Sequence, residues 1–397
     1  MISLHNARAL IQAKIQPLPG QAALLEKALG RVLREDVFAA DDLPAFDRSA
    51  MDGYAVGLDD DSPRFRVVGE IQPGVAPALT LQRGECARIF TGAQIPSGAS
   101  QVLMQEDVRA EENVVTPLRR SRITHIRRRG EDARRGDLLL KNGARLGAGE
   151  LALLSSLGVV QPKVSPPSRV VHFATGNELI DPAQAPAPGQ IRDSNSTLVA
   201  ALVNAFGDEL AWQERVPDDL DMLVQKAHAR FEQGCDLLLV SGGASVGRYD
   251  FGRPLLAKLG FQTHFEKINL RPGKPLVFAT RDRQAAFILP GNPVSHFVVL
   301  HAAVRLALEM YAGAEAHWPL AKVRLAENFD YRPDTRETYW PARVTIQDGE
   351  LVSHALPWQS SGDVAGLAGA NALLQFPGRI DSPKAGDIIQ ALLLELP

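Results

Sequence analysis

The chain has 397 residues, which is long enough for roughly two to four domains, because single hydrophobic cores rarely grow beyond about 250–300 residues. Its 43 Lys and Arg residues are balanced by 46 Asp and Glu residues, and the formal net charge is -3. This balance excludes the strongly basic character typical of nucleic-acid-binding proteins. We therefore expect a small molecule or another subunit as the partner, and no nucleic acid.

Cysteine content and hydropathy indicate the compartment. The only cysteines are Cys86 and Cys235, which lie far apart in the sequence and predict two free thiols in a reducing environment. The N-terminus lacks the charged start and apolar block of a signal peptide, and no apolar run of about 18 residues indicates a membrane span. We expect a cytoplasmic protein that does not associate with a membrane.

The first part of the chain is predicted to contain a small β module inserted into a partly helical region. Residues 3–35 have the pattern of two helices separated by a Pro-Gly turn. Short strands and turn signals then fill residues 46–126, and mixed structure with a helix at 149–158 follows. Residues 1–45 and 127–166 are therefore assigned to one region, which the mostly-β module interrupts.

The clearest pattern is the alternation of strands and helices from residue 167 to residue 316. Strands are predicted at 169–174, 210–215, 236–240 and 287–289, and helices at 194–205, 220–233 and 294–312. Such alternation predicts a parallel sheet with both faces covered. Residues 317–397 contain alternating segments with Pro and Gly between them, which predict a compact β domain. The fold class is thus multidomain α/β plus β.

Two glycine-rich turns follow buried strands of this α/β block. One is the segment VSGGASVGRYD at 240–250, and the other is LPGNPVS at 289–295. A glycine turn at the end of a strand lets backbone N–H groups approach an anion without interference from a Cβ atom. Both turns are therefore candidate phosphate sites that could face one ligand. The alternative for each turn is a tight connection that binds nothing.

Acidic residues follow the same strand ends. Glu178 comes after the first predicted strand, Asp218 after the second, and Asp250 after the first glycine turn. Because ligands of parallel sheets lie beyond the carboxyl ends of the strands, we expect these carboxylates to converge on the glycine turn and to bind Mg²⁺ beside a phosphate. Asp52, in the segment DRSAMDGY, is a further candidate, although a local turn explains its Asp-Gly pair as well.

Basic residues gather in two segments. The segment KINLRPGKP at 267–275 places three cations around a Pro-Gly turn. The segment RRRGED at 127–132 places guanidinium groups beside two carboxylates, and it is either an oxyanion site or an exposed ion-pair cluster. The nine histidines form no metal-spaced pair, and His296 is expected to be an ordinary polar residue of a helix.

Seven segments carry a family resemblance, because they occur in one order along nearly the whole chain. They are FDRSAMDGYAV at 46–56, RIFTGAQIP at 88–96, RRRGED at 127–132, ATGNEL at 174–179, VSGGASVGRYD at 240–250, RPGKP at 271–275 and LPGNPVS at 289–295. The chain resembles the molybdopterin molybdenumtransferase (MoeA) family, the molybdenum insertases to which the gephyrin E domain is related. The resemblance implies a MoaB/Mog-like central domain at 167–316 that binds molybdopterin, and a β-barrel-like domain at 317–397.

The resemblance also implies a reaction and an assembly. Members of the family insert molybdenum from molybdate into adenylylated molybdopterin and release AMP with the help of Mg²⁺. They are homodimers, with residues 1–45 and 127–166 matching the dimerisation region, and molybdopterin adenylyltransferase and apo-molybdoenzymes are candidate partners. Two alternatives stay open: a molybdopterin adenylyltransferase, and a non-catalytic molybdopterin carrier or scaffold.

Positions that match the family motifs imply the site residues. Those implied to be catalytic are Asp52, Thr91, Asp132, Glu178, Asp218, Asp250, Lys267, Arg271 and Lys274, of which Glu178, Asp218 and Asp250 would also bind the metal. Those implied to bind substrate are Arg129, Ser241, Gly242, Gly243, Ser245, Gly247, Pro290, Gly291, Asn292, Pro293 and Ser295. Three positions depart from the family pattern: Asn177 is usually Asp, Arg271 is often Lys, and His125 is commonly Asn.

Overall fold

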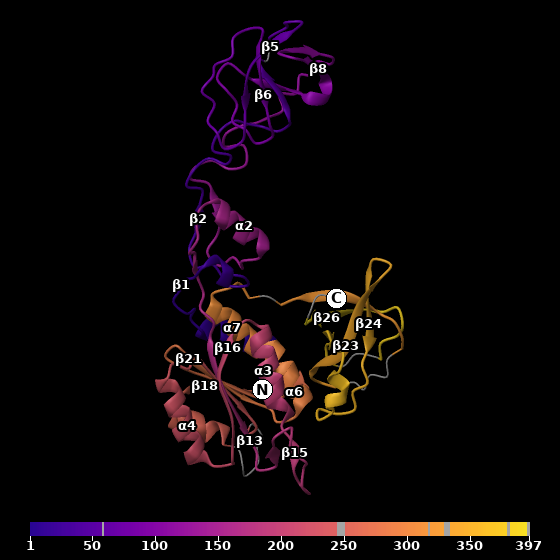
Figure 1. The fold of residues 1–397 in the computed structure, drawn as a ribbon. Helices are drawn as coiled ribbons and strands as arrows, with labels where there is room; N and C mark the ends of the chain where they lie inside the picture. Colours follow the sequence, from indigo (N-terminus) through magenta and orange to yellow (C-terminus); the bar gives the residue numbers. More distant parts are fainter. Residues whose placement is uncertain (58, 244–250, 317, 329–333, 379–381, 395–397) are drawn as a thin grey trace. The chain divides into compact units, whose positions relative to one another are not determined.

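The computed structural model describes the chain except for residues 58, 244–250, 317, 329–333, 379–381 and 395–397 (Figure 1). The chain divides into two compact units. The main unit contains Met1–Arg34, Gly143–Gly147 and Gln161–Pro397, and the inserted unit contains Glu35–Asn142 and Ala148–Val160. The segment 46–126 lies wholly in the inserted unit.

The inserted unit is built on a mixed six-stranded sheet with apolar side chains on both faces. The strands are β4 Gly53–Val56, β5 Phe65–Ile71, β6 Glu85–Ile89, β7 Gln101–Met104, β8 Val108–Glu111 and β9 Val114–Pro117, in the order β7-β4-β6-β5-β9-β8. Because side chains alternate along a strand, Tyr54 and Val56 enter one apolar cluster and Ala55 enters the other. The prediction of a mostly-β module is confirmed.

Short elements complete the inserted unit. They are β2 Val37–Phe38, β3 Arg48–Ser49, η2 Gln105–Asp107, β10 Ile126–Arg127, β11 Leu138–Leu140 and α2 Ala148–Ser156. Strand β3 pairs with β10, and β2 pairs with β11, both in antiparallel fashion. Shortly after α2 the chain reaches Gly158, whose φ of 74° suits the end of a helix. The helix predicted at 149–158 is confirmed.

The main unit contains a six-stranded sheet covered by helices on both faces (Figure 1). The strands are β13 Arg169–Thr175, β16 Glu209–Val216, β17 Leu237–Ser241, β18 Gln262–Lys267, β20 Pro275–Arg281 and β21 Gln284–Leu289, in the order β16-β13-β17-β21-β20-β18. The helices are α1 Leu4–Lys14, α3 Ser194–Ala205, α4 Leu220–Glu232 and α5 Gly252–Lys258. Leu237 and Leu239 pack with α1 and α3 on one face, whereas Leu238 and Val240 pack with α4 and α5 on the other.

Only part of this sheet is parallel. Strands β16, β13, β17 and β21 run parallel, but β20 pairs antiparallel with both β21 and β18. Strands β20 and β21 are joined by the turn Asp282–Arg283, which is too short for the crossover that parallel neighbours need. The prediction of a parallel sheet is therefore wrong at this edge. Two further short strands, β14 Leu179–Ile180 and β15 Ile191–Arg192, pair outside the sheet.

The helix predicted at 294–312 is one continuous helical segment whose winding changes in the middle. It comprises α6 Pro293–Val299, the π-helical segment η3 Leu300–Val304 and α7 Arg305–Ala312. By length and composition, with a mean hydropathy of 1.2, this segment is apolar enough to cross a membrane, yet 89% of its most apolar window is buried inside the protein. Its side chains belong to the main apolar cluster, so it is a core helix of the main unit.

The second N-terminal helix predicted from the sequence is wrong. After α1 the chain forms β1 Gln21–Ala22 and a single 3-10 turn, η1 Leu25–Lys27. Strand β1 pairs with β12 Lys163–Val164, and the N–H of Gly30 donates to the carbonyl oxygen of Leu146 at 2.8 Å. Pairing with distant segments thus replaces the hydrogen bonds that a helix would make, and it overrides a helical pattern of apolar residues.

The C-terminal part of the main unit is a closed five-stranded barrel, which confirms the predicted barrel-like domain. Its elements are β22 Leu320–Leu325, β23 Glu337–Gln347, β24 Glu350–Ala355, η4 Val364–Leu367, β25 Ala372–Phe376 and β26 Ile388–Leu393. Pairing runs in the order β23-β24-β22-β26-β25 and closes between β25 and β23. A short strand of the α/β domain, β19 Leu270–Arg271, pairs with β23. This pairing brings the segment RPGKP alongside the barrel.

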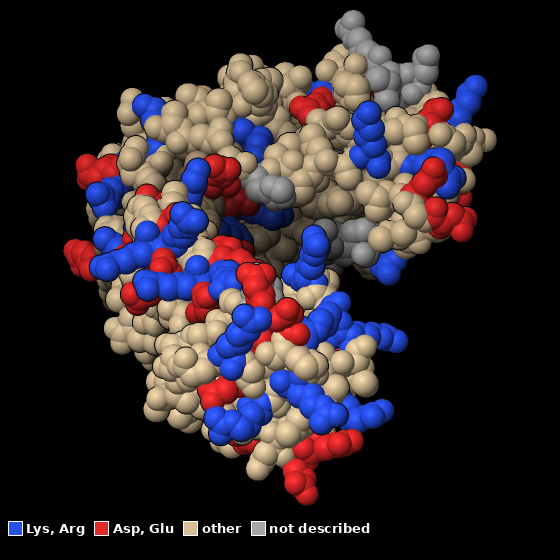
Figure 2. All heavy atoms as spheres, turned by 90° about the horizontal axis from the view of Figure 1, so that it is seen from above, with Lys and Arg blue, Asp and Glu red and all other residues tan. Residues whose placement is uncertain are grey.

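Charged residues of both signs are mixed on the surface. Figure 2 shows Lys and Arg side chains interspersed with Asp and Glu side chains over the face that it presents. Surface ion pairs include Arg66 with Glu85 at 2.5 Å and Arg324 with Glu350 at 2.8 Å. Exposed pairs of this kind contribute at most about 1 kcal/mol each, so they have little effect on the fold.

The two cysteines are free and buried, as predicted. Burial raises the pKa of Cys86 to about 12, and it does the same for Cys235. Since the thiolate is the reactive form, both side chains behave as apolar core residues.

Candidate functional site

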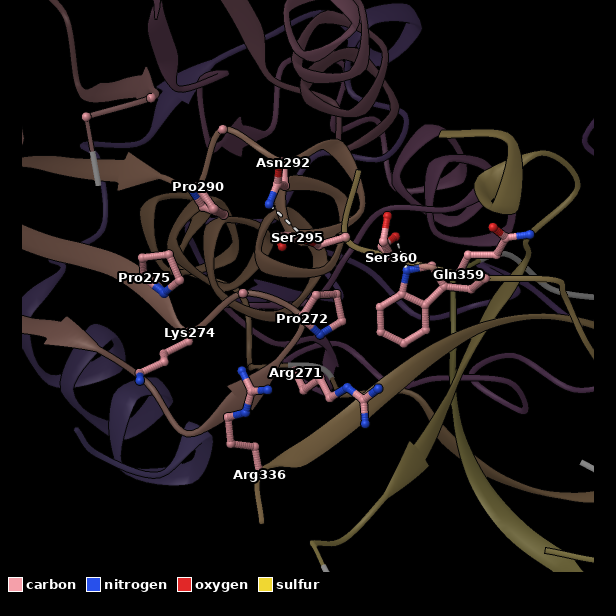
Figure 3. Close-up of a pocket in the computed structure, with 16 residues that line it drawn as sticks. Arg271, Pro272, Lys274, Pro275, Pro290, Asn292, Ser295, Arg336, Gln359 and Ser360 are labelled. Atoms are coloured by element: carbon pink, nitrogen blue, oxygen red, sulfur yellow. Dashed lines mark hydrogen bonds between the residues drawn. The ribbon is translucent and has the colours of Figure 1, made fainter. Parts of the chain in front are cut away.

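A pocket of about 610 Å³ lies in the main unit where the α/β domain meets the barrel (Figure 3). Its walls come from three segments that the sequence singled out and from loops of the barrel. The lining residues are Gly242, Gly243, Arg271, Pro272, Gly273, Lys274, Pro275, Pro290, Gly291, Asn292, Ser295, Arg336, Trp358, Gln359, Ser360 and Ser361. The structure therefore brings both glycine turns and the cationic loop to one cavity.

The first glycine turn needs glycine because of its own backbone. Gly242 has a φ of 94°, in the left-handed region that other residues rarely adopt. A Cβ atom there would lie 2.7 Å from the hydroxyl oxygen and 2.8 Å from the carbonyl oxygen of Thr175. The N–H of Gly242 donates to the carbonyl oxygen of Leu289 at 3.2 Å, so this turn is tied to the second one.

The second glycine turn is held by hydrogen bonds to its carbonyl groups. His296 Nδ1 lies 3.0 Å from the carbonyl oxygen of Pro290, and Asn195 Nδ2 donates to that of Gly291 at 2.7 Å. A Cβ atom on Gly291 would meet no atom within 4 Å. The turn is thus held by groups on its carbonyl side, while Gly291 leaves open space beside the pocket that it lines.

Cationic side chains come from the RPGKP loop and from the barrel. Figure 3 shows Arg271, Lys274 and Arg336 on one side of the pocket, opposite Asn292. Asp334 Oδ2 lies 2.7 Å from Arg336 Nη2 and 3.8 Å from Arg271 Nε. The hydrogen bonds from Arg336, with the charge of Arg271, lower the pKa of Asp334 to about 2. Asp334 thereby aligns two guanidinium groups, which suit a phosphate or another oxyanion.

The barrel supplies pocket residues that the sequence analysis missed. They are Arg336, Trp358, Gln359, Ser360 and Ser361. The ring of Trp358 packs edge-on against Trp340 with centroids 4.6 Å apart, and Asn292 Nδ2 donates to Ser361 Oγ at 2.8 Å. These residues lie in loops and share no spacing pattern, so the sequence alone does not indicate that the barrel contributes to the site.

Two of the three predicted metal ligands lie near one another beyond the central sheet. Glu178 follows β13 and Asp218 follows β16, and these two strands are paired. Burial raises the pKa of Asp218, and the negative charge of Glu178 raises it further. The third ligand, Asp250, lies outside the described residues, as do Ser245 and Gly247. Within the described residues, no group of three or more His, Cys, Asp or Glu side chains is arranged to hold a metal ion.

Four predicted site residues belong to the inserted unit. Asp52 Oδ1 accepts hydrogen bonds from the N–H of Thr91 at 2.7 Å and from its hydroxyl at 2.8 Å, and these bonds lower the pKa of Asp52. Asp132 pairs with an arginine of its own segment, RRRGED. Arg129 Nε donates to Asp42 Oδ2 at 2.6 Å. The arginines of RRRGED form ion pairs, and the role of the segment as an oxyanion site stays a prediction.

Three other predicted residues of the main unit do not line the pocket. Ser241 is 2% exposed and bonds to His172 and His296, so it does not line the pocket. Pro293 begins α6, and Lys267 ends β18. The catalytic and binding roles of all these positions stay predictions.

The three departures from the family pattern have identifiable surroundings. Asn177 Oδ1 accepts a hydrogen bond from the N–H of Asp218 at 3.2 Å. Arg271 lies in β19 and lines the pocket, so the positive charge is kept at the site. His125 has a φ of 51°, a left-handed conformation in which Asn, Asp and His are all enriched. His125 therefore suits the backbone that the more common Asn would adopt.

Family models match three consecutive regions of the chain. The MoeA N-terminal region (domain I and II) matches residues 2–158, a probable molybdopterin binding domain matches 172–309, and the MoeA C-terminal region (domain IV) matches 322–394. The molybdopterin molybdenumtransferase of Staphylococcus epidermidis is 31% identical over 382 residues, covering 94% of this chain and 90% of its own. That of a Nostoc species is 37% identical over 387 residues, covering 93% and 87%.

A solved structure has the same fold over the full length. The molybdopterin biosynthesis MoeA protein of Pyrococcus horikosii matches with a TM-score of 0.82 and 27% identity, covering 100% of this chain and 99% of its own. The match therefore extends over both units of this chain. The chain therefore belongs to the molybdopterin molybdenumtransferase (MoeA) family.

Proposed function

We propose that this transferase inserts molybdenum from molybdate into adenylylated molybdopterin, with cleavage of the phosphoanhydride bond and release of AMP. The observation that carries the proposal is the pocket in which two glycine turns and three cationic side chains meet. Relatives named molybdopterin molybdenumtransferase support the transfer of molybdenum to molybdopterin. The probable molybdopterin binding domain that matches 172–309 supports the α/β domain as the place where molybdopterin binds.

The pocket suits a ligand with several negative charges. Arg271, Lys274 and Arg336 bring positive charge to its wall, and residues of both glycine turns line it. Its volume of about 610 Å³ falls within the usual range for small-molecule sites. Both substrates are anions, and AMP leaves with additional charge. We assign to the three cations the neutralisation of the phosphate groups and of the charge that develops on the leaving AMP.

Glu178 and Asp218 are the residues that would hold Mg²⁺. Burial raises the pKa of Asp218, and the negative charge of Glu178 raises it further, so the two carboxylates lie close enough to interact. Carboxylate oxygens are ligands that Mg²⁺ prefers, and one or two of them together with substrate phosphates make a common Mg²⁺ site. The pair therefore fits the ion. Bound there, Mg²⁺ would polarise the phosphate oxygens of the substrate.

The family resemblance extends the proposal to the assembly and its setting. We infer a cytoplasmic homodimer with residues 1–45 and 127–166 in the dimerisation region. Its substrate would come from a molybdopterin adenylyltransferase, and apo-molybdoenzymes would receive its product. Light scattering during size-exclusion chromatography should give twice the mass of one chain, and a monomer at all concentrations would contradict the assembly.

The experiment that tests the reaction follows AMP and molybdenum together. Purified protein is given adenylylated molybdopterin with or without molybdate and Mg²⁺, and AMP and molybdenum-loaded molybdopterin are quantified. We expect AMP release to need both additions and to fall about 100-fold in Glu178→Gln, because a preorganised charge at the phosphates is lost. The matched control is Asp221→Asn, since Asp221 is an exposed acid of the same domain, paired with Lys258.

Two outcomes would replace the proposal. Formation of adenylylated molybdopterin from molybdopterin and ATP, without transfer of molybdenum, would make the protein an adenylyltransferase. Tight binding of the substrate without any release of AMP would make it a carrier.

A further inference from the structure

We propose that a chain of hydrogen bonds through His172, Ser241 and His296 positions the two glycine turns of the pocket, with Ser241 and His296 as positioning residues for substrate binding. The inference rests on the proposed function, because the turns are taken to hold the phosphate groups of the substrate. None of the three residues lines the pocket, so they act only through the turns that they support.

All three side chains are buried, where polar groups are costly. His172 in β13 and His296 in α6 are 0% exposed, and Ser241 at the end of β17 is 2% exposed. Removing a hydroxyl or an imidazole from water costs free energy unless other hydrogen bonds replace those made to water. Whether these three side chains stabilise the turns therefore depends on their hydrogen-bond partners.

Each group in this series donates a hydrogen bond to the next one. Gln213 Nε2 donates to the carbonyl oxygen of Ser196 at 2.9 Å, and the same nitrogen lies 2.9 Å from His172 Nδ1. An amide nitrogen only donates, so His172 Nδ1 accepts and the ring hydrogen is on Nε2. His172 Nε2 then donates to Ser241 Oγ, which lies 2.6 Å away.

The chain of bonds continues to the second turn. His296 Nδ1 must donate, because its partner at 3.0 Å is the carbonyl oxygen of Pro290. His296 Nε2 is therefore an acceptor, and the Ser241 hydroxyl donates to it over 3.4 Å. Both imidazoles are neutral in this arrangement. Burial supports this, because it lowers the pKa of His172 to about 3 and that of His296 to about 4.

This series of hydrogen bonds sets the orientation of the peptide groups at the second turn. The peptide bond between Pro290 and Gly291 is trans and planar, so holding the carbonyl group of Pro290 directs the N–H of Gly291 to the opposite side. Asn195 holds the next carbonyl group, that of Gly291, and so directs the N–H of Asn292 in the same way. Gly291 and Asn292 both line the pocket. The buried His296 and the partly exposed Asn195 thus orient two successive N–H groups of the kind that bind anions.

The same series of hydrogen bonds connects the second turn to the first. Ser241 directly precedes Gly242, whose N–H donates to the carbonyl oxygen of Leu289 at 3.2 Å. One main-chain bond and one side-chain path, through Ser241 and His296, therefore connect the two turns. If either bond of the side-chain path is removed, the turns stay connected only through the main chain, by this bond and by the pairing of β17 with β21.

The helical segment that contains His296 also provides a matched control. His301 is 5% exposed, and neither of its ring nitrogens has a hydrogen-bond partner within the described part of the chain. It packs edge-on against Phe206 and Phe297. Replacing His301 therefore removes a buried imidazole without affecting the turns.

The test compares His296→Leu, His296→Asn and Ser241→Ala with His301→Leu. We measure KM and kcat for AMP release, and the affinity for inorganic pyrophosphate by calorimetry. His296→Leu should raise KM about tenfold or more with little change in kcat, because a buried carbonyl loses its donor. His296→Asn keeps a donor for the carbonyl oxygen of Pro290, so its KM should lie between those of the wild type and His296→Leu. Ser241→Ala should raise KM as His296→Leu does. His301→Leu should keep the wild-type KM.

Failure of the inference is distinguishable from failure of the proposed function. A wild-type protein that releases no AMP would refute the proposed function, and the pyrophosphate affinities would still test the positioning. The positioning role is contradicted if Ser241→Ala and His296→Leu change KM and pyrophosphate affinity no more than His301→Leu does. A nitrogen-15 spectrum of the wild type should show His172 and His296 neutral with the tautomers given above, and a charged His296 ring at neutral pH would overturn the inference.

Discussion

The two glycine turns of the pocket have similar compositions but need glycine for different reasons. At Gly242, a φ of 94° and the oxygen atoms of Thr175 exclude any side chain. At Gly291, no atom would lie within 4 Å of a Cβ atom. Glycine is thus required by the fold in the first turn, whereas in the second it keeps open space that belongs to the pocket. Composition alone does not separate these two cases.

The largest effect is expected for Gly242→Ala. The new methyl group would lie 2.8 Å from the carbonyl oxygen of Thr175, and the left-handed backbone would be strained. We expect the free energy of unfolding to fall by about 2–4 kcal/mol, as for other residues forced into a forbidden conformation. Denaturant unfolding measures this change. If stability were unchanged, the first turn would tolerate a side chain and the contrast with the second would disappear.

The pH dependence of the free energy of unfolding tests whether the two histidines that connect the turns are buried and neutral. The pKa values of His172 and His296 in the folded protein, about 3 and about 4, lie below the ordinary value of 6.5. The unfolded chain therefore takes up more protons than the folded protein as the pH falls from about 6.5 toward 4, and stability is lost over that interval but complete above it. Each histidine adds up to about 1.4 kcal/mol per pH unit to the slope. Unfolding between pH 4.5 and 7.5 should show this slope, reduced in His296→Leu, and a flat profile would contradict the buried neutral pair.

Gly291→Ala tests the second turn, where we expect an effect on binding and not on stability. Because the Cβ atom would enter open space, we expect stability to stay within about 0.5 kcal/mol of the wild type. The methyl group would intrude into the pocket, so KM for the substrate should rise about tenfold. Gly149→Ala is the control, since a Cβ atom there also meets nothing within 4 Å but Gly149 lies in α2 and not in the pocket. Equal KM values for the two variants would show that Gly291 has no role in binding.

The smallest effect is expected for Ser361→Ala, which removes the barrel's side-chain contact with the second turn. Asn292 Nδ2 would lose its acceptor, which lies 2.8 Å away. The N–H of Val294 would keep the carbonyl oxygen of residue 361, at 3.0 Å. One partly exposed hydrogen bond is worth about 0.5–1 kcal/mol, so KM should rise about two- to fivefold. A larger change would mean that the barrel, rather than His296 and Asn195, mainly sets the second turn.

Much of the fold could be predicted because local signals agreed with tertiary structure. The helix predicted at 194–205 is α3 with the same bounds, and the Asp193 side chain caps it by accepting from the N–H of Ser196. The second N-terminal helix was predicted wrongly because its apolar spacing is also compatible with strand pairing to residues far along the chain. The antiparallel edge was missed because no strand was predicted at β18 or β20, whose sequences flank the cationic loop.

The site was predicted where a motif carries the chemistry within a few residues. Gly242, Arg271 and Lys274 come from such motifs, and all three line the pocket. Arg336 and Trp358 do so as well, but they come from loops of another domain, which no local pattern connects to the motifs. The hydrogen bonds among His172, Ser241 and His296 could not be predicted from the sequence either. These residues lie in separate elements, and their bonds depend on the order of the strands in the sheet. His296 lies in a helix, as the sequence indicated, but it is buried and bonds to the carbonyl oxygen of Pro290.

The most direct test of the central claim is molybdate-dependent AMP release by the wild type, by Lys274→Met, and by Lys258→Met as the control. Lys274 lines the pocket, whereas Lys258 is a surface residue of the same domain, paired with Asp221. We predict that AMP and molybdenum-loaded molybdopterin appear together, that Lys274→Met lowers the rate about 100-fold, and that Lys258→Met has no effect. AMP release that needed no molybdate, or that survived Lys274→Met unchanged, would contradict insertion of molybdenum at this pocket.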